Sequence, residues 1–348
     1  MIGERLRQAR KAAHMSLREL AEQVGLSHTA IDKFERDTNT PHSTMLLKLS
    51  EALGVSVDYL LRPPTVELQA VGYRSHKGFT PTKSGQILAD VTDKVERHLE
   101  LYDLVPGTLP AFNKPRVAAP IESLDQVEDV AEKTRETWRL GFNPIPDLFD
   151  TLEEHGIIVL QSHVISANTF SGLSAWAGKV PVIIVSTEWP SDRQRFTACH
   201  ELGHLLLHGK LSPELDEEKA CDRFAGAFLA PKPSVISALG ATRTWIDHRE
   251  LALLKAEYGL SMNAWLYRAK DCGVISPRKA GQLFGYFKKR GWDKDEPSKV
   301  CPQEEPRRFP QTVFRAVAED IIGESKAAEL LAVSRPSLQR MRDDVDRS

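Results

Sequence analysis

The chain of 348 residues is 41% hydrophobic and 27% charged, with a formal net charge of −2, which is ordinary for a soluble globular protein of two or three domains and excludes a general attraction to nucleic acid. Its four cysteines lack the spacing of a disulfide framework, no apolar run approaches the ~18 residues of a membrane span, and the N-terminus has no signal-peptide core. We therefore expect a cytoplasmic protein without a membrane segment, in which any DNA binding is local.

Residues 1–62 predict a separate unit of five short helices. Apolar residues recur at helical spacing, Gly25 and Gly54 end two of the helices, and Ser27 and Ser43 cap the helices that follow them. The run S-L-R-E-L-A-E-Q-V-G-L-S-H-T-A-I-D-K-F-E-R resembles the lambda-repressor-like (XRE) helix-turn-helix family. This resemblance implies that the unit binds DNA.

The recognition helix of that family corresponds to residues 27–36, which would enter the major groove by its N-terminal half. Three of its side chains project away from the apolar face and are candidates for contacts with base edges: His28, Thr29 and Lys33. Two arginines are candidates for phosphate contacts: Arg10 and Arg36. Because the unit carries little net positive charge, dimerisation is the alternative role.

Residues 63–122 predict a connector. An amphipathic helix from Thr82 to Leu104 carries apolar residues along one side, and we expect it to pack on the following domain or on a second subunit. The run P-G-T-L-P-A-F-N-K-P predicts a flexible linker after it.

The stretch R-F-T-A-C-H-E-L-G-H-L-L-L-H predicts a helix with metal-binding side chains. Ser191 and Gln194 predict a capping box at its start. His200 and His204 are four residues apart and leave the same helix face, while Glu201 between them can approach a metal-bound water without being a ligand. This is the H-E-x-x-H arrangement of zinc peptidases.

A catalytic zinc requires three protein ligands, so a third donor is expected on a second helix. Glu218 is the expected ligand, and Asp222, four residues later, is expected to hold the far ring nitrogen of His200. H-E-x-x-H followed by E-x-x-x-D resembles the gluzincin metallopeptidases. The other candidate ligands are Glu217, His208, Cys199 and Cys221, and we interpret the two cysteines as buried apolar side chains.

The runs R-Q-R-F-T-A-C-H-E-L-G-H and E-K-A-C-D-R-F-A-G-A-F-L-A-P resemble the ImmA/IrrE family of bacterial metallopeptidases, over at least residues 127–231. The resemblance implies that His200, His204 and Glu218 bind zinc and that Glu201 is catalytic. Asp222 stands where Asn is common in the family, and Asp fits the same orienting role. Those enzymes cut helix-turn-helix repressors and so derepress stress or mobile-element genes.

Two helices and three strands are predicted before the metal-binding helix, over residues 127–139, 146–155, 157–161, 169–177 and 180–186. The alternation in F-S-G-L-S-A-W predicts an edge strand with one exposed side. Metallopeptidases of this kind bind substrate by adding its backbone to such an edge. The candidate substrate strand is therefore Phe170, Ser171, Gly172, Leu173, Ser174, Ala175 and Trp176, and the alternative is a solvent edge without a ligand.

Residues 241–348 predict a C-terminal helical region, with helices over residues 248–258, 262–272 and 278–290. A final segment, residues 310–342, has the pattern of another small helix-turn-helix. Its balanced charge favours docking or capping over DNA reading.

The predicted fold class is mainly α with a small β-sheet (α+β). We expect a five-helix helix-turn-helix domain at residues 1–62, a connector at 63–122, a gluzincin-like metallopeptidase domain at 123–240 and the helical region at 241–348.

The predicted function is that of a cytoplasmic, DNA-binding transcriptional regulator with a zinc-dependent endopeptidase domain, for which manganese is the alternative metal. The expected partners are a double-stranded DNA operator, a helix-turn-helix repressor as substrate, and a second copy of the chain in a homodimer. One alternative is a transcription factor whose metal site is a non-catalytic sensor or structural clamp. The other alternative is a repressor that cleaves itself.

Overall fold

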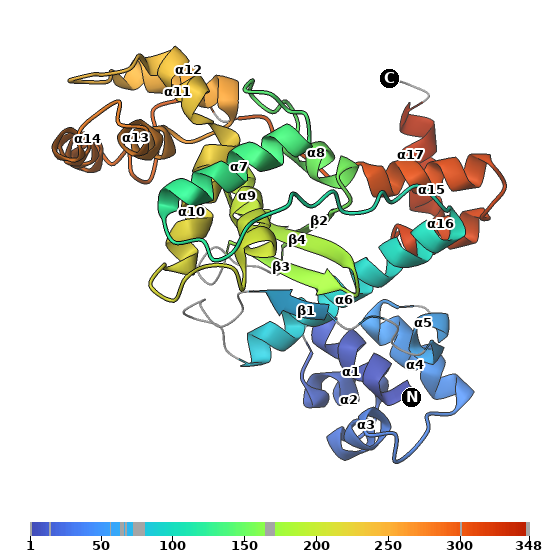
Figure 1. Cartoon of the computed structure of the whole chain (residues 1–348). Helices are drawn as coiled ribbons and strands as arrows, with labels where there is room; N and C mark the ends of the chain where they lie inside the picture. The colour runs from blue at the N-terminus through green and yellow to red at the C-terminus, as the bar shows by residue number, and fades with distance from the viewer. Residues whose placement is uncertain are drawn as a thin grey trace. The chain divides into compact units, whose positions relative to one another are not determined.

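The computed structural model describes residues 2–13, 15–55, 57–62, 66, 68–71, 81–163, 171–299 and 301–345 (Figure 1). These residues form 17 helices and four strands, which confirms the predicted α+β class. The chain divides into two compact units: unit 1 comprises residues 1–69, 78–109 and 307–348, and unit 2 comprises residues 70–77 and 110–306.

Five short helices open unit 1, as predicted: α1 (Ile2–Ala12), α2 (Leu17–Val24), α3 (His28–Glu35), α4 (Ser43–Leu53) and α5 (Val57–Leu61). Buried apolar side chains from all five helices form one core. The Ser27 hydroxyl accepts a hydrogen bond from the Ala30 amide and caps α3, as predicted. The predicted cap of α4 is wrong, because Ser43 is already helical and the ring of His42 accepts the amide of Met45 instead.

Four more helices complete unit 1: α6 (Pro81–Leu104), α15 (Arg308–Ala318), α16 (Glu324–Leu330) and α17 (Arg335–Val345). Leu101 of α6 shares a core with Phe309 and Val313 of α15. Lys326 forms an ion pair with Glu100 on α6. The helix predicted to pack on the following domain or a second subunit therefore packs inside unit 1, against α1, α15 and α16.

A buried histidine makes this core sensitive to acid. His98 stacks on Phe309 with ring centroids 3.8 Å apart, and its Nδ1 lies 2.8 Å from the carbonyl oxygen of Lys94. Burial lowers the pKa of His98 to about 3, and the nearby charges of Arg97 and Lys94 act in the same direction. The neutral ring is therefore part of the folded core.

We expect unit 1 to lose stability as the pH falls below about 6.5, the ordinary pKa of histidine in an unfolded chain. The unfolded state then binds a proton that the folded state excludes until about pH 3, so the free energy of unfolding should drop by about 2 kcal/mol between pH 7 and pH 5. Hydrogen exchange of peptides from α6 and α15 in urea, corrected for intrinsic rates, measures this drop. His98→Phe should remove the drop and the control His28→Gln should retain it; an equal drop in both variants would contradict the assignment.

The first elements of unit 2 are two helices and a sheet: α7 (Leu124–Thr137), α8 (Leu148–Glu154), β2 (Ile158–Ser162), β3 (Gly172–Ala177) and β4 (Val180–Ser186). With β1 (Leu68–Val71), the strand order is β1-β3-β4-β2. β2 runs parallel to β4 with Ile158 opposite Val182, and β3 runs antiparallel to β4 with Gly172 opposite Val185.

The prediction that β3 is an edge strand with one exposed side is wrong. β3 lies between β1 and β4, and Leu173, Ser174 and Ala175 are buried. Phe170, the first residue of the predicted substrate strand, lies outside the described residues. The sequence alternation failed here because both faces of the strand are covered.

Six helices follow or cover this sheet: α9 (Ser191–Leu207), α10 (Glu217–Leu229), α11 (Lys232–Leu239), α12 (His248–Tyr258), α13 (Met262–Asp271) and α14 (Pro277–Lys289). α9 packs on β3 and β4, and α10 packs on α9 and α7. Apolar side chains of these elements form one continuous core. None of the helices in the described ranges combines the length and apolarity needed to cross a membrane.

The predicted capping box of α9 is wrong. The helix begins after Pro190 without a side-chain cap. The Ser191 hydroxyl donates to the carbonyl oxygen of Pro302, and the Gln194 amide donates to that of Trp189. Both side chains on which the prediction relied thus donate hydrogen bonds to carbonyl groups of residues outside the helix.

The two units group the chain differently from the four predicted segments. Residues 307–348 belong to the same compact unit as the first five helices, and residues 110–306 form the body of the other unit. The predicted boundaries at residues 62, 122 and 240 describe parts that fold independently. They stay a prediction, which limited proteolysis can test.

Candidate metal centre

Two glycines allow the three elements of the centre to approach closely. A Cβ on Gly203 of α9 would lie 3.2 Å from the Cα of Cys221 on α10. A Cβ on Gly172 of β3 would lie 2.4 Å from Thr197 and 3.2 Å from the Cγ of Glu201, both on α9. Larger side chains at these two positions would separate the elements. The glycines therefore allow α10 and β3 to lie close to the part of α9 that carries the H-E-x-x-H residues.

An ion-pair cluster fixes α10 in place. Glu128 on α7 accepts from Arg223 on α10 at 2.8 Å and from Arg268 on α13 at 2.7 Å. Arg268 is 2% exposed, so this pairing is shielded from solvent. The helix that carries the predicted third ligand is thereby held against two neighbours.

The structure brings the three predicted ligands together. His200 Nε2 lies 3.4 Å from Glu218 Oε2, and His204 Nε2 lies 3.5 Å from Glu218 Oε1. Two ligands bound at about 2.1 Å to a tetrahedral zinc ion lie roughly 3.4 Å apart. Two imidazole nitrogens and a carboxylate oxygen at this spacing fit zinc.

Each histidine also contacts a carboxylate through its other nitrogen. His200 Nδ1 lies 2.8 Å from Asp222 Oδ1, the partner expected from the sequence. His204 Nδ1 lies 3.0 Å from Glu217 Oε1. Donation from Nδ1–H to a carboxylate fixes the tautomer that leaves Nε2 free to bind a metal.

The role of Glu217 escaped the sequence argument, which considered it only as a competing ligand. Its Oε1 also lies 3.0 Å from Nδ1 of His208, which is the C-cap of α9. Glu217 is the first residue of α10, directly before Glu218. The E-x-x-x-D spacing relates only Glu218 to Asp222, so it does not predict a contact between Glu217 and a histidine. The repeated acidic residue, E-E, is the sequence feature that could have indicated two different carboxylate roles.

Glu201 is placed as expected for a proton acceptor. Its side chain is 2% exposed, and its Oε2 atom has no hydrogen-bond partner within the part of the chain that the structure describes. A buried carboxylate oxygen without a donor is costly unless a ligand or water binds it. This oxygen can therefore accept a hydrogen bond from a bound water or ligand.

The centre is strongly negative. Burial lowers the pKa of His200, but hydrogen bonds to Asp222 and Glu218 and the charge of Glu201 outweigh it and raise the pKa to about 10. A site that favours a positive charge to this extent also favours a divalent cation.

Cys221 lies close to both histidines but is a poor fourth donor. Its Sγ atom belongs to a group with His200 and His204 whose ligand atoms lie within 4.8 Å of one another. Burial and the nearby carboxylates raise the pKa of the Cys221 thiol, and metal binding requires the thiolate. Cys199 is likewise buried, and burial raises the pKa of its thiol.

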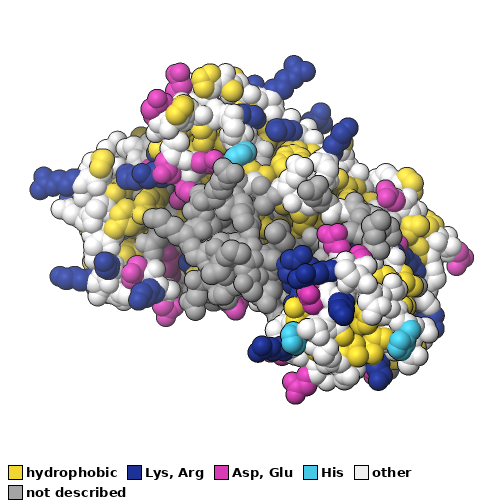
Figure 2. Space-filling view, turned by 90° about the horizontal axis from the view of Figure 1, so that it is seen from below, with side chains coloured by type: hydrophobic (Ala, Val, Ile, Leu, Met, Phe, Trp, Pro, Cys, Tyr) yellow, Lys and Arg dark blue, Asp and Glu magenta, His cyan; other side chains and the backbone are white. Residues whose placement is uncertain are grey.

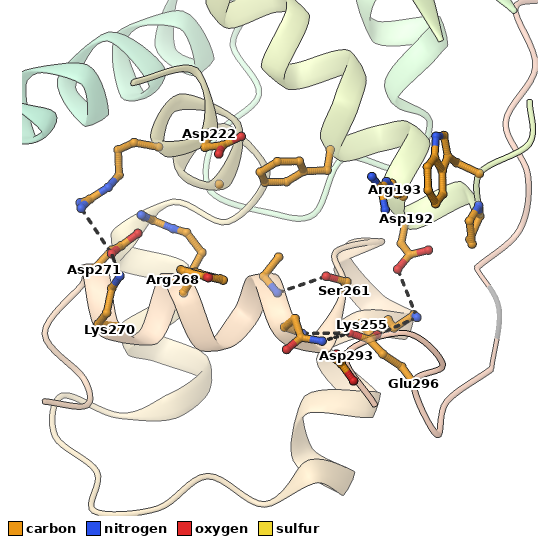
Figure 3. Close-up of a pocket in the computed structure, with 18 of the residues that line it drawn as sticks. Asp192, Arg193, Asp222, Lys255, Ser261, Arg268, Lys270, Asp271, Asp293 and Glu296 are labelled. Atoms are coloured by element: carbon orange, nitrogen blue, oxygen red, sulfur yellow. Dashed lines mark hydrogen bonds and ion pairs between the residues drawn. The ribbon is translucent and has the colours of Figure 1, made fainter. Parts of the chain in front are cut away.

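Asp222 also lines a pocket of about 820 Å³ (Figure 3). The start of α9, one side of α10, α13 and residues 293–298 form its walls. Lys255 in its wall bridges Asp192 at 3.1 Å and Glu296 at 2.9 Å. A molecule bound here would contact the carboxylate that orients His200.

Four of the five predicted DNA contacts are exposed on unit 1: His28, Thr29, Lys33 and Arg36. Arg10 is different, because its guanidinium is 11% exposed, lies 2.8 Å from Glu35 Oε2 and donates to the carbonyl oxygen of Met15. Arg10 therefore forms an ion pair between α1 and α3, and its phosphate contact stays a prediction. In the view of Figure 2, basic side chains are scattered among acidic and hydrophobic ones and do not form one continuous patch.

Comparisons with known proteins match both parts of the chain. Residues 6–60 match the helix-turn-helix family model, and residues 152–270 match the model of the IrrE N-terminal-like domain. The chain is 40% identical over 60 residues to the HTH-type transcriptional regulator ImmR of Bacillus subtilis (strain 168), which covers 17% of this chain and 47% of that protein.

Two other regulators are also similar. The repressor protein C2 of Salmonella phage P22 is 35% identical over 77 residues, which are 22% of this chain and 36% of that protein. SinR of Bacillus subtilis (strain 168) is 44% identical over 62 residues, which are 18% of this chain and 56% of that protein. The matched residues span 36–56% of the length of these three regulators. The chain combines a helix-turn-helix domain of the kind found in transcriptional regulators with a metallopeptidase-type domain, as the sequence predicts.

Proposed function

We propose that this fusion of a helix-turn-helix domain and an IrrE N-terminal-like domain is a DNA-binding regulator that hydrolyses a regulatory protein in a zinc-dependent reaction. One observation carries the proposal. The Nε2 atoms of His200 and His204 converge on the Glu218 carboxylate at 3.4 and 3.5 Å, beside the buried Glu201.

The residues divide the chemistry among them. His200, His204 and Glu218 hold the metal, while Asp222 and Glu217 keep the two imidazoles in the metal-binding tautomer. Zinc, when bound, supplies Lewis-acid chemistry that polarises a carbonyl group and lowers the pKa of water. Glu201 accepts the proton of the attacking water and delivers it to the leaving amine.

A helix-turn-helix repressor is the proposed substrate. The similar proteins named above are a repressor and transcriptional regulators, and the resemblance to the ImmA/IrrE family favours a substrate of this class. A double-stranded operator and a second copy of the chain are the proposed partners of the N-terminal helices, since dimers of this fold read paired half-sites.

Metal removal tests the proposal. The purified protein is treated with a chelator, dialysed, and reloaded with zinc or manganese in the presence of candidate helix-turn-helix repressors. Cleavage that stops on chelation and returns with metal supports the proposal. A protein that retains one metal ion per chain and cleaves no repressor would instead be a sensor or a structural clamp.

Substitutions of two exposed basic residues of the helix-turn-helix domain should change DNA binding in different ways. Lys33→Ala should relax the base preference by about 1–3 kcal/mol at the contacted position. Arg36→Ala should weaken binding to all sequences and reduce the slope of log K against log salt concentration by about 0.9. Titrations of labelled DNA at several salt concentrations measure both effects.

Lys48 on α4 is exposed and serves as the matched control, because Lys48→Ala removes the same charge away from α3. DNA binding that stays unchanged in both α3 variants would show that Lys33 and Arg36 do not contact DNA, and no DNA binding at low salt would assign this unit to protein docking.

A further inference from the structure

The strand that precedes α6 occupies a position beside β3. β1 lies next to β3 on the side away from β4. Its last two residues, Ala70 and Val71, belong to unit 2, and Val71 is 7% exposed within the core of that unit. Backbone groups on this side of β3 are therefore hydrogen-bonded to β1.

The start of β3 lies against the candidate metal centre. Gly172 of β3 packs against Glu201, because a Cβ on this glycine would lie 3.2 Å from the Glu201 Cγ. β4 pairs with the opposite side of β3 along its whole length. A peptide that adds to β3 beside Glu201 must consequently take the place of β1.

We propose that β1 is a tethered inhibitor, which blocks the addition of an extended peptide to β3 and keeps the proposed peptidase inactive. This inference rests on the proposed function for its consequence, but the occupancy of β3 can be tested without catalysis. The occupant is defined by the chain: it is the segment Leu68–Val71, between the helix-turn-helix domain and α6.

The tether makes this competition effective. A segment of the same chain meets its site in an intramolecular step, with an effective concentration that can reach the order of mM. A free substrate at about 10 µM that pairs equally well would therefore be outcompeted roughly 100-fold. Displacement of β1 would release the site, so any event that pulls on this segment could activate the domain.

The test uses a strand-breaking variant of the full chain. Successive amide groups of a strand point to opposite sides, so one of the two prolines in Gln69→Pro/Ala70→Pro removes a donor that faces β3. Gln69→Ala keeps the backbone donors and is the matched control. Both are prepared in the Glu201→Gln background without added metal, so that no outcome depends on hydrolysis.

Two readouts report occupancy. Hydrogen exchange of those amides between Leu173 and Ala177 that face β1 should accelerate at least about 10-fold in the double-proline variant and stay unchanged in the control, while the amides that face β4 stay protected in both. A fluorescent peptide with the sequence V-E-L-Q-A-V-G-Y should bind this variant at least about 10-fold more tightly than wild type. Unchanged exchange and equal peptide binding would overturn the proposal.

A third readout separates this inference from the proposed function. With Glu201 restored and zinc added, the double-proline variant should cleave unfolded casein at least about 10-fold faster than wild type. If the double-proline variant exposes the β3 amides and binds the peptide but no variant cleaves casein, the proposed peptidase activity would be rejected. The proposal that β1 occupies β3 would still stand. Wild-type protein that cuts itself between residues 66 and 77, at a rate independent of protein concentration, would show that the segment is a substrate and overturn its role as inhibitor.

Discussion

Glu201→Gln should retain zinc at the wild-type stoichiometry and lose about 10²–10⁴-fold of its cleavage rate, the range that general acid–base catalysis contributes. The glutamine has the shape of the glutamate but cannot accept a proton. Glu201 lies between the two histidine ligands in sequence but on a different side of α9, so the substitution leaves the three metal ligands in place.

The structure makes this substitution a clean test. The Glu201 side chain is buried, and its Cγ lies close to β3, where a Cβ on Gly172 would be only 3.2 Å away. Zinc content by elemental analysis and the rate of repressor cleavage are measured on the same preparations. Glu214→Gln, in the exposed loop before α10, is the control for the loss of one negative charge.

Equal cleavage by wild type and Glu201→Gln would remove Glu201 from the mechanism. Loss of zinc together with activity would instead assign Glu201 a structural role at the metal. The sensor hypothesis predicts a third pattern, in which both proteins hold zinc and neither cleaves.

The parts of the centre that the sequence predicted all follow from helix periodicity. His200 and His204 share a face because they are four residues apart, and Glu218 and Asp222 share a face for the same reason. These relations need no knowledge of the tertiary structure. The close approach of α9 and α10 at Gly203 and Cys221 then brings the two faces together.

The failed predictions depend on contacts between distant segments. Ser191 had a sequence partner for a capping box, but Pro302 takes its hydroxyl group. The alternation in β3 indicates an edge strand, but β1, about 100 residues earlier in the chain, covers that edge.

Glu218→Ala should weaken zinc binding by more than 100-fold, whereas Glu217→Ala and Asp222→Ala should each weaken it by about 10–100-fold. The order follows from the geometry. Glu218 faces the Nε2 atoms of both histidines, whereas Asp222 contacts His200 and Glu217 contacts His204 only through the far Nδ1 atom. Competition against a chromophoric zinc chelator at fixed pH measures the three affinities.

The comparison of Glu217 with Glu218 is the most informative, because adjacent glutamates of α10 then differ only in which nitrogen they face. Glu214→Ala removes the same carboxylate from the preceding loop and should leave the affinity unchanged. If Glu217→Ala lost more zinc than Glu218→Ala, Glu217 would be the third ligand and the histidine rings would have to bind the metal through Nδ1. If Asp222→Ala left the affinity unchanged, Asp222 would not orient His200, and the tautomer of that ring would depend on the metal alone.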